Sequence, residues 1–135
     1  MSRLSRTATR TMVIAAAAAL AGGLTAIPAQ AASSGGGCTN RSAGGTTISA
    51  CISYSADFVR PDYYVDVRGA DCKGVTWYMI DNGSVRQQGI GTCSRGHWGP
   101  YPWFVATITG SHYYYMKIVA NTGPTVYSPN LYVSP

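Results

Sequence analysis

Four cysteines in a short chain with an apolar leader constrain this sequence most strongly. The chain has 135 residues, and the cysteines are Cys38, Cys51, Cys72 and Cys93. Its first 31 residues contain arginines, then an apolar run, and then small residues ending in Ala29-Gln30-Ala31. This order is that of a secretory signal peptide with its cleavage site. Because disulfides persist in oxidising compartments, we expect a secreted, extracellular protein with two disulfides.

The sequence divides into three parts of different composition. Residues 1–31 are the expected signal peptide, residues 32–45 a flexible Gly/Ser-rich tail, and residues 46–135 a single β-domain. Three of the ten basic residues lie in the leader. After cleavage the chain therefore contains seven basic residues and five aspartates, which give a net charge of +2. Without a basic cluster we expect no nucleic-acid partner, and the apolar run is too short to predict a membrane span.

Beyond residue 45, apolar and polar residues alternate in short segments separated by turn signals. Alternation with period two predicts β-strands, and nowhere do apolar residues recur at helical spacing for three turns. The expected strands cover residues 48–54, 63–68, 75–79, 85–92, 103–109, 113–120, 126–127 and 131–133. About seven or eight short strands at this spacing predict an all-β fold, a small antiparallel β-sandwich that is immunoglobulin-like or barrel-like.

The turn Asp81-Asn82-Gly83-Ser84 yields a sharper prediction about the cysteines. Asn-Gly favours a two-residue type I′ hairpin turn, because both residues tolerate positive φ. Opposed residues in such a hairpin share one index sum, and positions 81 and 84 add to 165, as do positions 72 and 93. Cys72 and Cys93 should therefore face each other, about 4.5 Å apart at Cα. Of the three possible connectivities, this register favours Cys72–Cys93 and leaves Cys38 to pair with Cys51.

Few residues in the chain could perform catalysis. There is no glutamate, and only two histidines, His97 and His112, accompany the five aspartates. We interpret Asp81 as a turn residue, Asp62 as a solvated loop charge and His112 as a strand-end residue. No serine lies in a nucleophile-elbow motif, and the histidines are too far apart in sequence to suggest a zinc site. We therefore predict no catalytic residue, no metal and no cofactor, hence a protein that is not an enzyme.

The segment 94–102 is the first candidate for binding a partner. It carries Arg95, His97, Trp98 and Tyr101, and two prolines restrict its backbone. Trp, Tyr and Arg are the usual anchors of protein interfaces, and a stiff loop loses little entropy when it docks. The alternative is that Trp98 closes an open end of the sandwich.

A run of three tyrosines is the second candidate. Strand alternation places Tyr114 on the inner face and Tyr113 and Tyr115 on the outer face, with Tyr64 of another strand as a further member. Such rings could stack on sugars or contact a protein. The alternative is ordinary cross-strand packing of aromatic residues.

The layout resembles that of small secreted β-proteins of actinobacteria, with a leader rich in Arg and Ala, a tail over Ala32 to Gly45 and four cysteines. It resembles in particular the small adaptor subunit of umbrella toxin particles. This resemblance implies a β-domain that joins lectin-bearing and toxin subunits in antagonism between bacteria, and it assigns no contact residues.

Three functions fit the sequence. The first is an adaptor, a non-catalytic protein-interaction module in an extracellular complex. The second is a secreted inhibitor of a protease or glycosidase, which would use the 94–102 segment. The third is a carbohydrate-binding module, which would use the exposed tyrosines and tryptophans.

Overall fold

The computed structural model describes residues 32–135. Within these residues the regular secondary structure consists of β-strands alone. The expected signal peptide lies outside the described residues. The strands are β1 (Ala32–Gly35), β2 (Gly37–Ala43), β3 (Thr46–Ser55), β4 (Phe58–Val67), β5 (Val75–Asp81), β6 (Ser84–Gly91), β7 (Gly96–Trp98), β8 (Trp103–Phe104), β9 (His112–Ala120), β10 (Thr125–Tyr127) and β11 (Leu131–Ser134).

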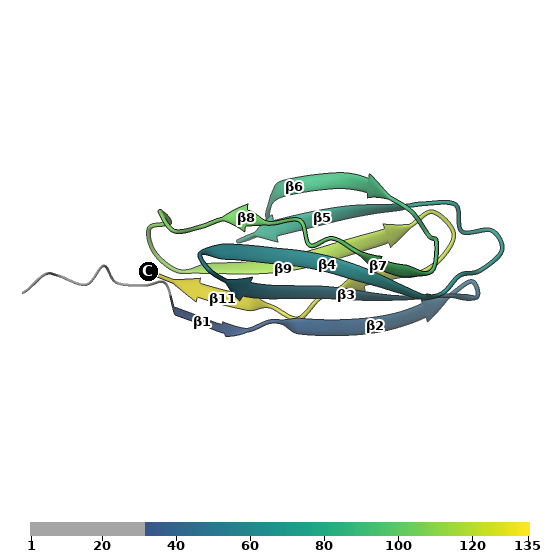
Figure 1. The fold of residues 1–135 in the computed structure, drawn as a ribbon, viewed down its shortest axis with the longest axis horizontal. Helices are drawn as coiled ribbons and strands as arrows, with labels where there is room; N and C mark the ends of the chain where they lie inside the picture. Colours follow the sequence, from purple (N-terminus) through teal and green to yellow (C-terminus); the bar gives the residue numbers. More distant parts are fainter. Residues whose placement is uncertain (1–31) are drawn as a thin grey trace, which may run out of the picture.

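These strands form two antiparallel sheets, as expected for a small β-sandwich. Sheet A has six strands in the order β1-β11-β9-β5-β6, and β10 also pairs with β9. Sheet B has five strands in the order β2-β3-β4-β7, and β8 also pairs with β4. The long strands run along the longest axis of the molecule (Figure 1). Three of the eleven strands, β1, β2 and β7, were not predicted, because their segments show no apolar alternation.

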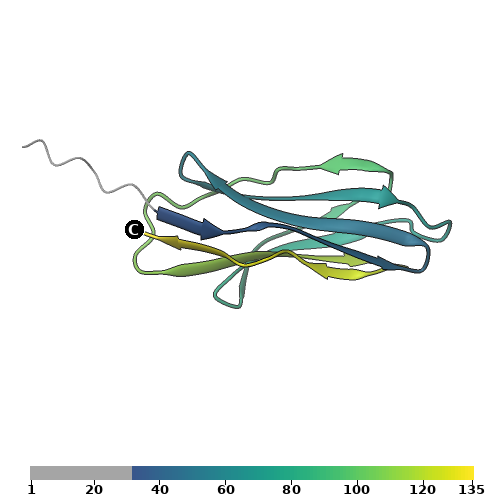
Figure 2. The ribbon, with the colours of Figure 1, turned by 90° about the horizontal axis from the view of Figure 1, so that it is seen from below.

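The N-terminal segment differs from the flexible tail that its composition suggested. β1 pairs with β11 of sheet A, and β2 pairs with β3 of sheet B. Figure 2 shows this segment running along the side of the molecule, first beside β11. The chain changes sheets at Gly36, whose φ is +81° and where a Cβ would lie 2.7 Å from the carbonyl oxygen of Ile52. Glycine here permits a close backbone crossing between the sheets instead of giving flexibility.

The core lies between the sheets and follows most of the predicted alternation. Side chains from β3, β4, β5 and β9 that were expected to point inward are buried: Ile48, Ala50, Ile52, Tyr63, Val65, Val75, Trp77, Met79, Tyr114, Met116 and Ile118. Val67 is an exception, with 52% of its surface exposed. The pairing of β3 with β4 skips Asp66 between Val65 and Val67, and this bulge turns Val67 to the outer face.

Both predicted disulfides are confirmed, but the register argument for one of them is wrong. Asn82 and Gly83 have φ values of 47° and 83°, as a type I′ turn requires. The β5–β6 register then shifts between Met79 and Ile80, which breaks the constant index sum. Cys72 and Cys93 lie beyond the ends of both strands, with Cα atoms 5.8 Å apart. The directly opposed cross-strand pair is Cys38–Cys51, at 4.1 Å.

The segment 103–109 is also not a continuous strand. Only Trp103 and Phe104 pair with β4, and the chain then crosses to β9 as a loop. Val105 is fully buried in this crossing, and Ile108 packs against the same core cluster. The loop therefore closes one end of the sandwich.

Candidate functional site

The outer face of sheet A presents a row of tyrosines. Tyr114 is fully buried, whereas Tyr113 on the opposite face of β9 is 51% exposed and Tyr115 is half-buried. The predicted alternation of the three tyrosines is confirmed. The outward position next along β9 is Lys117, which is half-buried.

Neighbouring strands place further tyrosines on the same face. Tyr132 of β11 lies opposite Tyr113, and their ring centroids are 5.0 Å apart. Tyr78 of β5 and Tyr127 of β10 lie opposite Lys117 on its two sides. We call this surface the tyrosine face, and its members are Tyr78, Tyr113, Tyr115, Tyr127, Tyr132 and Lys117. Sequence reasoning found only part of it, because strand order decides which tyrosines become neighbours.

Lys117 is the single cation of the tyrosine face. Its Nζ atom lies 5.7 Å from the ring centroids of both Tyr78 and Tyr127, within cation–π range. Within residues 32–135, no carboxylate lies within salt-bridge distance of Lys117. The face can therefore offer flat aromatic rings, phenolic hydroxyls and one positive charge to a ligand.

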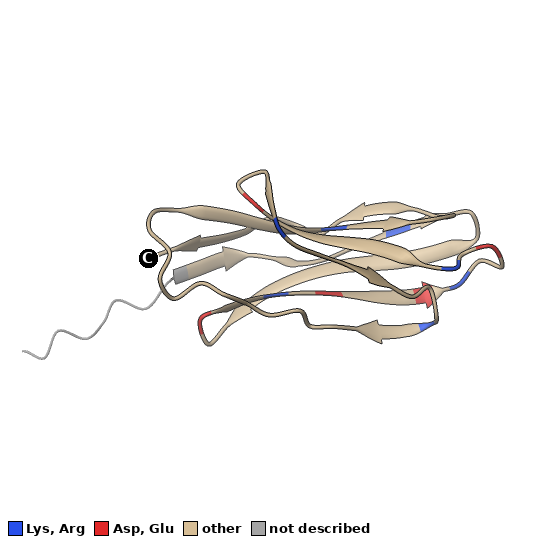
Figure 3. Cartoon of the chain, turned by 90° about the horizontal axis from the view of Figure 1, so that it is seen from above, with Lys and Arg blue, Asp and Glu red and all other residues tan. Residues whose placement is uncertain are grey.

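The outer face of sheet B is chemically different. Ser49 donates to Asp66 at 2.9 Å, and the Asn40 side chain reaches both residues. Across the ribbon, basic and acidic residues are interspersed without a continuous stretch of one sign (Figure 3). The outer face of sheet B thus combines these polar side chains with the aromatic pairs Tyr64–His97 and Phe58–Phe104.

The 94–102 segment is only in part the stiff loop that was expected. Residues Gly96–Trp98 are β7, which pairs with β4. Trp98 is half-buried, packs against the core, and donates its indole N–H to the carbonyl of Ser94 at 3.0 Å. Tyr101 also packs against the core and stacks on Trp77 with ring centroids 4.1 Å apart. The alternative that Trp98 closes the sandwich therefore fits the structure, and the role of Trp98 and Tyr101 as partner contacts stays a prediction.

The two other candidates of this segment remain accessible. Arg95 is exposed. His97 contacts Asp62 of β4, with Nε2 and Oδ2 2.6 Å apart, and its ring stacks on Tyr64 at 4.2 Å. Asp62 is thus a strand residue paired with a histidine, not a solvated loop charge. Tyr64 belongs to sheet B and does not join the tyrosine face.

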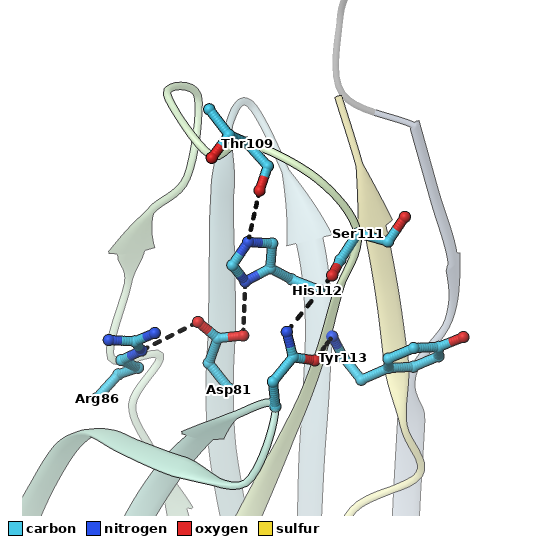
Figure 4. Close-up of polar contacts among 7 residues, drawn as sticks. Asp81, Arg86, Thr109, Ser111, His112 and Tyr113 are labelled. Atoms are coloured by element: carbon cyan, nitrogen blue, oxygen red, sulfur yellow. Dashed lines mark hydrogen bonds and ion pairs between the residues drawn. The ribbon is translucent and has the colours of Figure 1, made fainter.

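A second histidine–aspartate pair lies at the end of the sandwich and was missed by sequence reasoning. The side chain of Asp81 is only 4% exposed; it accepts from Arg86 Nε at 3.0 Å and contacts His112 Nδ1 at 2.7 Å. The other ring nitrogen of His112 faces the carbonyl of Thr109 at 3.3 Å (Figure 4). Both ring nitrogens of His112 therefore lie beside oxygen atoms, one of a side chain and one of the backbone.

The turn residue Asn82 strengthens the same region. Its side-chain oxygen accepts from the Tyr113 amide at 3.0 Å, and its side-chain amide donates to the Ser111 carbonyl at 3.4 Å (Figure 4). Asp81 and Asn82 therefore link the hairpin turn to the start of β9. Their visible role is to hold the turn and the 105–111 loop beside the tyrosine face.

Two buried tyrosines show altered acidity. Burial raises the pKa of Tyr63 to about 12, and burial together with the nearby Asp81 carboxylate raises the pKa of Tyr114 to about 12. The Tyr63 hydroxyl is hydrogen-bonded to the backbone of Thr92, whereas the Tyr114 hydroxyl has no partner within residues 32–135. Both are core residues and do not reach the tyrosine face.

The described part of the chain offers little for a small or metallic ligand. A shallow hollow of about 410 Å³ lies where the chain passes from β1 to β2, and Ser33, Cys38, Ser53 and Asp62 are among its lining residues. Within residues 32–135, no three His, Cys, Asp or Glu side chains gather in a way that could hold a metal ion. In the same residues, no helix is long and apolar enough to cross a membrane.

Comparison with protein-family models, curated proteins and solved structures finds no match to this chain.

Proposed function

We propose that this protein is a secreted, non-catalytic interaction module that binds a protein partner through the tyrosine face. The observation that carries the proposal is the continuous outer surface of sheet A, where Tyr113 is 51% and Tyr127 49% exposed. Tyrosine supplies a large contact area with few rotatable bonds, so it is a common interface anchor. The neighbouring rings and Lys117 already order each other, which lowers the entropy cost of docking.

Two features support the extracellular location that this proposal assumes. The two disulfides are consistent with an oxidising, extracellular environment. The leader over residues 1–31 has the sequence pattern of a secretory signal. In its most specific form, the proposal is an adaptor that joins subunits of an extracellular antibacterial toxin particle, the role implied by the resemblance to umbrella-particle adaptors.

One observation favours carbohydrate binding as a second candidate. Flat, exposed tyrosine rings on a sheet are suitable for stacking on sugar rings, and Tyr113 and Tyr127 are both about half exposed. The inhibitor interpretation has less support, because it would use the side chains of the 94–102 segment, and Trp98 and Tyr101 of that segment pack against the core.

The decisive experiment isolates the tagged protein from its native culture medium and identifies what is bound. The test variant is Tyr113→Ala with Tyr127→Ala, and the matched control is Tyr64→Ala, a 37% exposed tyrosine on sheet B. Loss of one tyrosine anchor typically costs about 2 kcal/mol, or about thirtyfold in affinity. We expect one protein to be recovered in stoichiometric amount with wild type and control, and at least thirtyfold less with the test variant.

Other outcomes separate the alternatives. Retention on an insoluble polysaccharide, lost in the same variant, would support the sugar-binding candidate. Equal recovery of the partner with both variants would show that the tyrosine face is not the interface. Turnover of a glycan, peptide or ester that is lost in Asp62→Asn or Asp81→Asn would contradict the non-catalytic proposal.

A further inference from the structure

The strand β6 is a free edge of sheet A. It runs for eight residues and pairs only with β5 among residues 32–135. In an antiparallel ladder every second residue directs its N–H and C=O away from its partner strand. β6 therefore presents a row of backbone donors and acceptors that no other described strand satisfies.

The other sheet edges are shorter or covered. β1 has four residues, β7 three and β8 two. β10 also has three residues and lies between Pro124 and Pro129, which cannot donate to a ladder. β2 is longer, but it lies against β10 of the other sheet and is linked to β3 by the Cys38–Cys51 disulfide. β6 is thus the edge best able to accept a strand.

The side chains of β6 do not oppose such pairing. The strand contains no proline and no lysine, and its one charge, Arg86, is already paired with Asp81 at 3.0 Å. Ile90 is 90% exposed and Val85 52% exposed, so apolar surface remains uncovered along the edge. The register shift lies near the hairpin turn, which leaves residues 87–91 as a regular strand.

We propose that β6 pairs antiparallel with β6 of a second copy of this chain, about a two-fold axis at Gln88. This register sets Gln88 opposite Gln88 of the second copy, and a primary amide both donates and accepts. It sets Gln87 opposite Gly89 of the second copy within the regular part of the strand, and it places each exposed Ile90 at the border of the paired stretch, beside the bulge at Arg86 of the second copy. The identical edge is therefore its own complement.

Electrostatics and topology both suit a second copy as the occupant. Residues 32–135 carry seven basic and five acidic side chains, so that the net charge of +2 gives little repulsion between copies. A two-fold axis perpendicular to the sheets would join the two A sheets into one and bring both tyrosine faces to the same side. The dimer would then present two tyrosine faces. The pairing itself does not depend on what the tyrosine face binds.

The test is sedimentation equilibrium of the purified protein over a range of concentrations. We expect a reversible monomer–dimer equilibrium for the wild type. Gln88→Glu and Gln88→Lys each place like charges opposite each other across the axis and should weaken dimerisation about fivefold or more. An equimolar mixture of the two variants should restore a heterodimer, because the charges then become complementary. Such rescue is expected only when residue 88 faces residue 88.

Ile90→Lys should weaken the dimer about tenfold, because it places charge on the edge and removes apolar contact. Val67→Lys is the matched control, since Val67 is also an exposed aliphatic residue but lies on sheet B. The melting temperature of each variant confirms that it is folded. A wild type that stays monomeric at its highest soluble concentration would overturn the proposal. So would dimerisation unaffected by Ile90→Lys, or a mixture of the Gln88 variants that gives no heterodimer.

Discussion

The hydroxyl of Tyr63 lies 3.2 Å from both the amide nitrogen and the carbonyl oxygen of Thr92. Tyr63 belongs to β4 of sheet B, and Thr92 directly follows β6, an edge strand of sheet A. One phenol therefore links the two sheets through the core, as both donor and acceptor. Tyr114 provides a natural comparison, because its buried hydroxyl has no hydrogen-bond partner within the described residues.

Removing the bonded hydroxyl of Tyr63 and the unbonded hydroxyl of Tyr114 should have different effects on stability. Tyr63→Phe removes two hydrogen bonds and should cost about 1–3 kcal/mol of unfolding free energy. Tyr114→Phe should cost little or stabilise the protein, because it removes an unsatisfied buried hydroxyl. Chemical denaturation at neutral pH measures both values. Equal losses in the two variants would show that the Tyr114 hydroxyl is bonded after all.

Alkaline pH should destabilise the protein through the same two phenols. The pKa of each is raised to about 12 in the folded state, against about 10 in the unfolded chain. The unfolded state therefore loses its phenolic protons first, so stability is full below pH 10 and falls as pH rises from 10 to 12. The fall should be about 2–3 kcal/mol for each tyrosine, from about 1.4 kcal/mol per pH unit. Melting curves of Tyr63→Phe and Tyr114→Phe should each show a smaller fall between pH 10 and 12 than those of the wild type.

The position beside Tyr63 requires glycine. A Cβ on Gly91 would lie 2.2 Å from the Tyr63 hydroxyl oxygen and 3.0 Å from a methyl carbon of Val75. Gly91→Ala should therefore destabilise the protein by about 1–3 kcal/mol through overpacking. The cost should shrink in a Tyr63→Phe background, because the nearest clashing atom is then gone. A double-mutant cycle measures this coupling, and additive losses would mean that the backbone moves away instead.

The two disulfides should differ in their resistance to reduction. Cys72 and Cys93 are 0% and 1% exposed, whereas Cys38 is exposed on strand β2. Limited treatment of the folded protein with a small phosphine reductant should open Cys38–Cys51 first, because a reductant must reach the sulfur atoms. Alkylation followed by peptide mass mapping gives the order. Earlier loss of Cys72–Cys93 would show that the 68–74 and 92–94 segments open before β2 detaches.

Asp81 should be a stability residue at the loop end of the sandwich. Asp81→Asn replaces a carboxylate that is only 4% exposed and contacts both Arg86 and His112, and should cost about 1–3 kcal/mol because hydrogen bonds of a buried charged acceptor are lost. Asp62→Asn is the matched control, since the Asp62 carboxylate is more exposed, at 17%, and contacts a single exposed partner, His97; it should cost less than about 1 kcal/mol. Urea denaturation compares the two. A larger loss at Asp62 would contradict the burial argument.

Trp98 should contribute to the stability of the fold through its packing. Its indole is half-buried against the core and bonded to Ser94, so Trp98→Ala should lower the unfolding free energy by about 3 kcal/mol. Thermal melting tests this, with Phe104→Ala as a control, because Phe104 is 55% exposed in the neighbouring strand β8. An unchanged melting temperature would restore Trp98 as a candidate contact residue.

Local sequence was enough to predict the long strands of the core, the alternation within them and the turn. Period-two patterns act between neighbouring residues, which is why the inward positions of β3, β5 and β9 were predicted correctly. The Asn82-Gly83 turn was predicted for the same reason, since its positive φ values depend on two residues alone. The outward direction of Tyr113 and Tyr115 also follows from alternation within one strand.

Only the tertiary structure decided which strands became neighbours. Bulges at Asp66 and near Arg86 shifted registers that a continuous alternation could not reveal. Residues 32–45 have a composition typical of a linker, yet they form the two strands β1 and β2. The chain crosses between the sheets at Gly36, where glycine permits a close approach of the backbone as well as flexibility. Strand order in sheet A brought Tyr78, Tyr127 and Tyr132 beside the predicted tyrosines. These contacts join residues that are far apart in the sequence. They are set by long-range packing, which leaves no pattern in the local sequence.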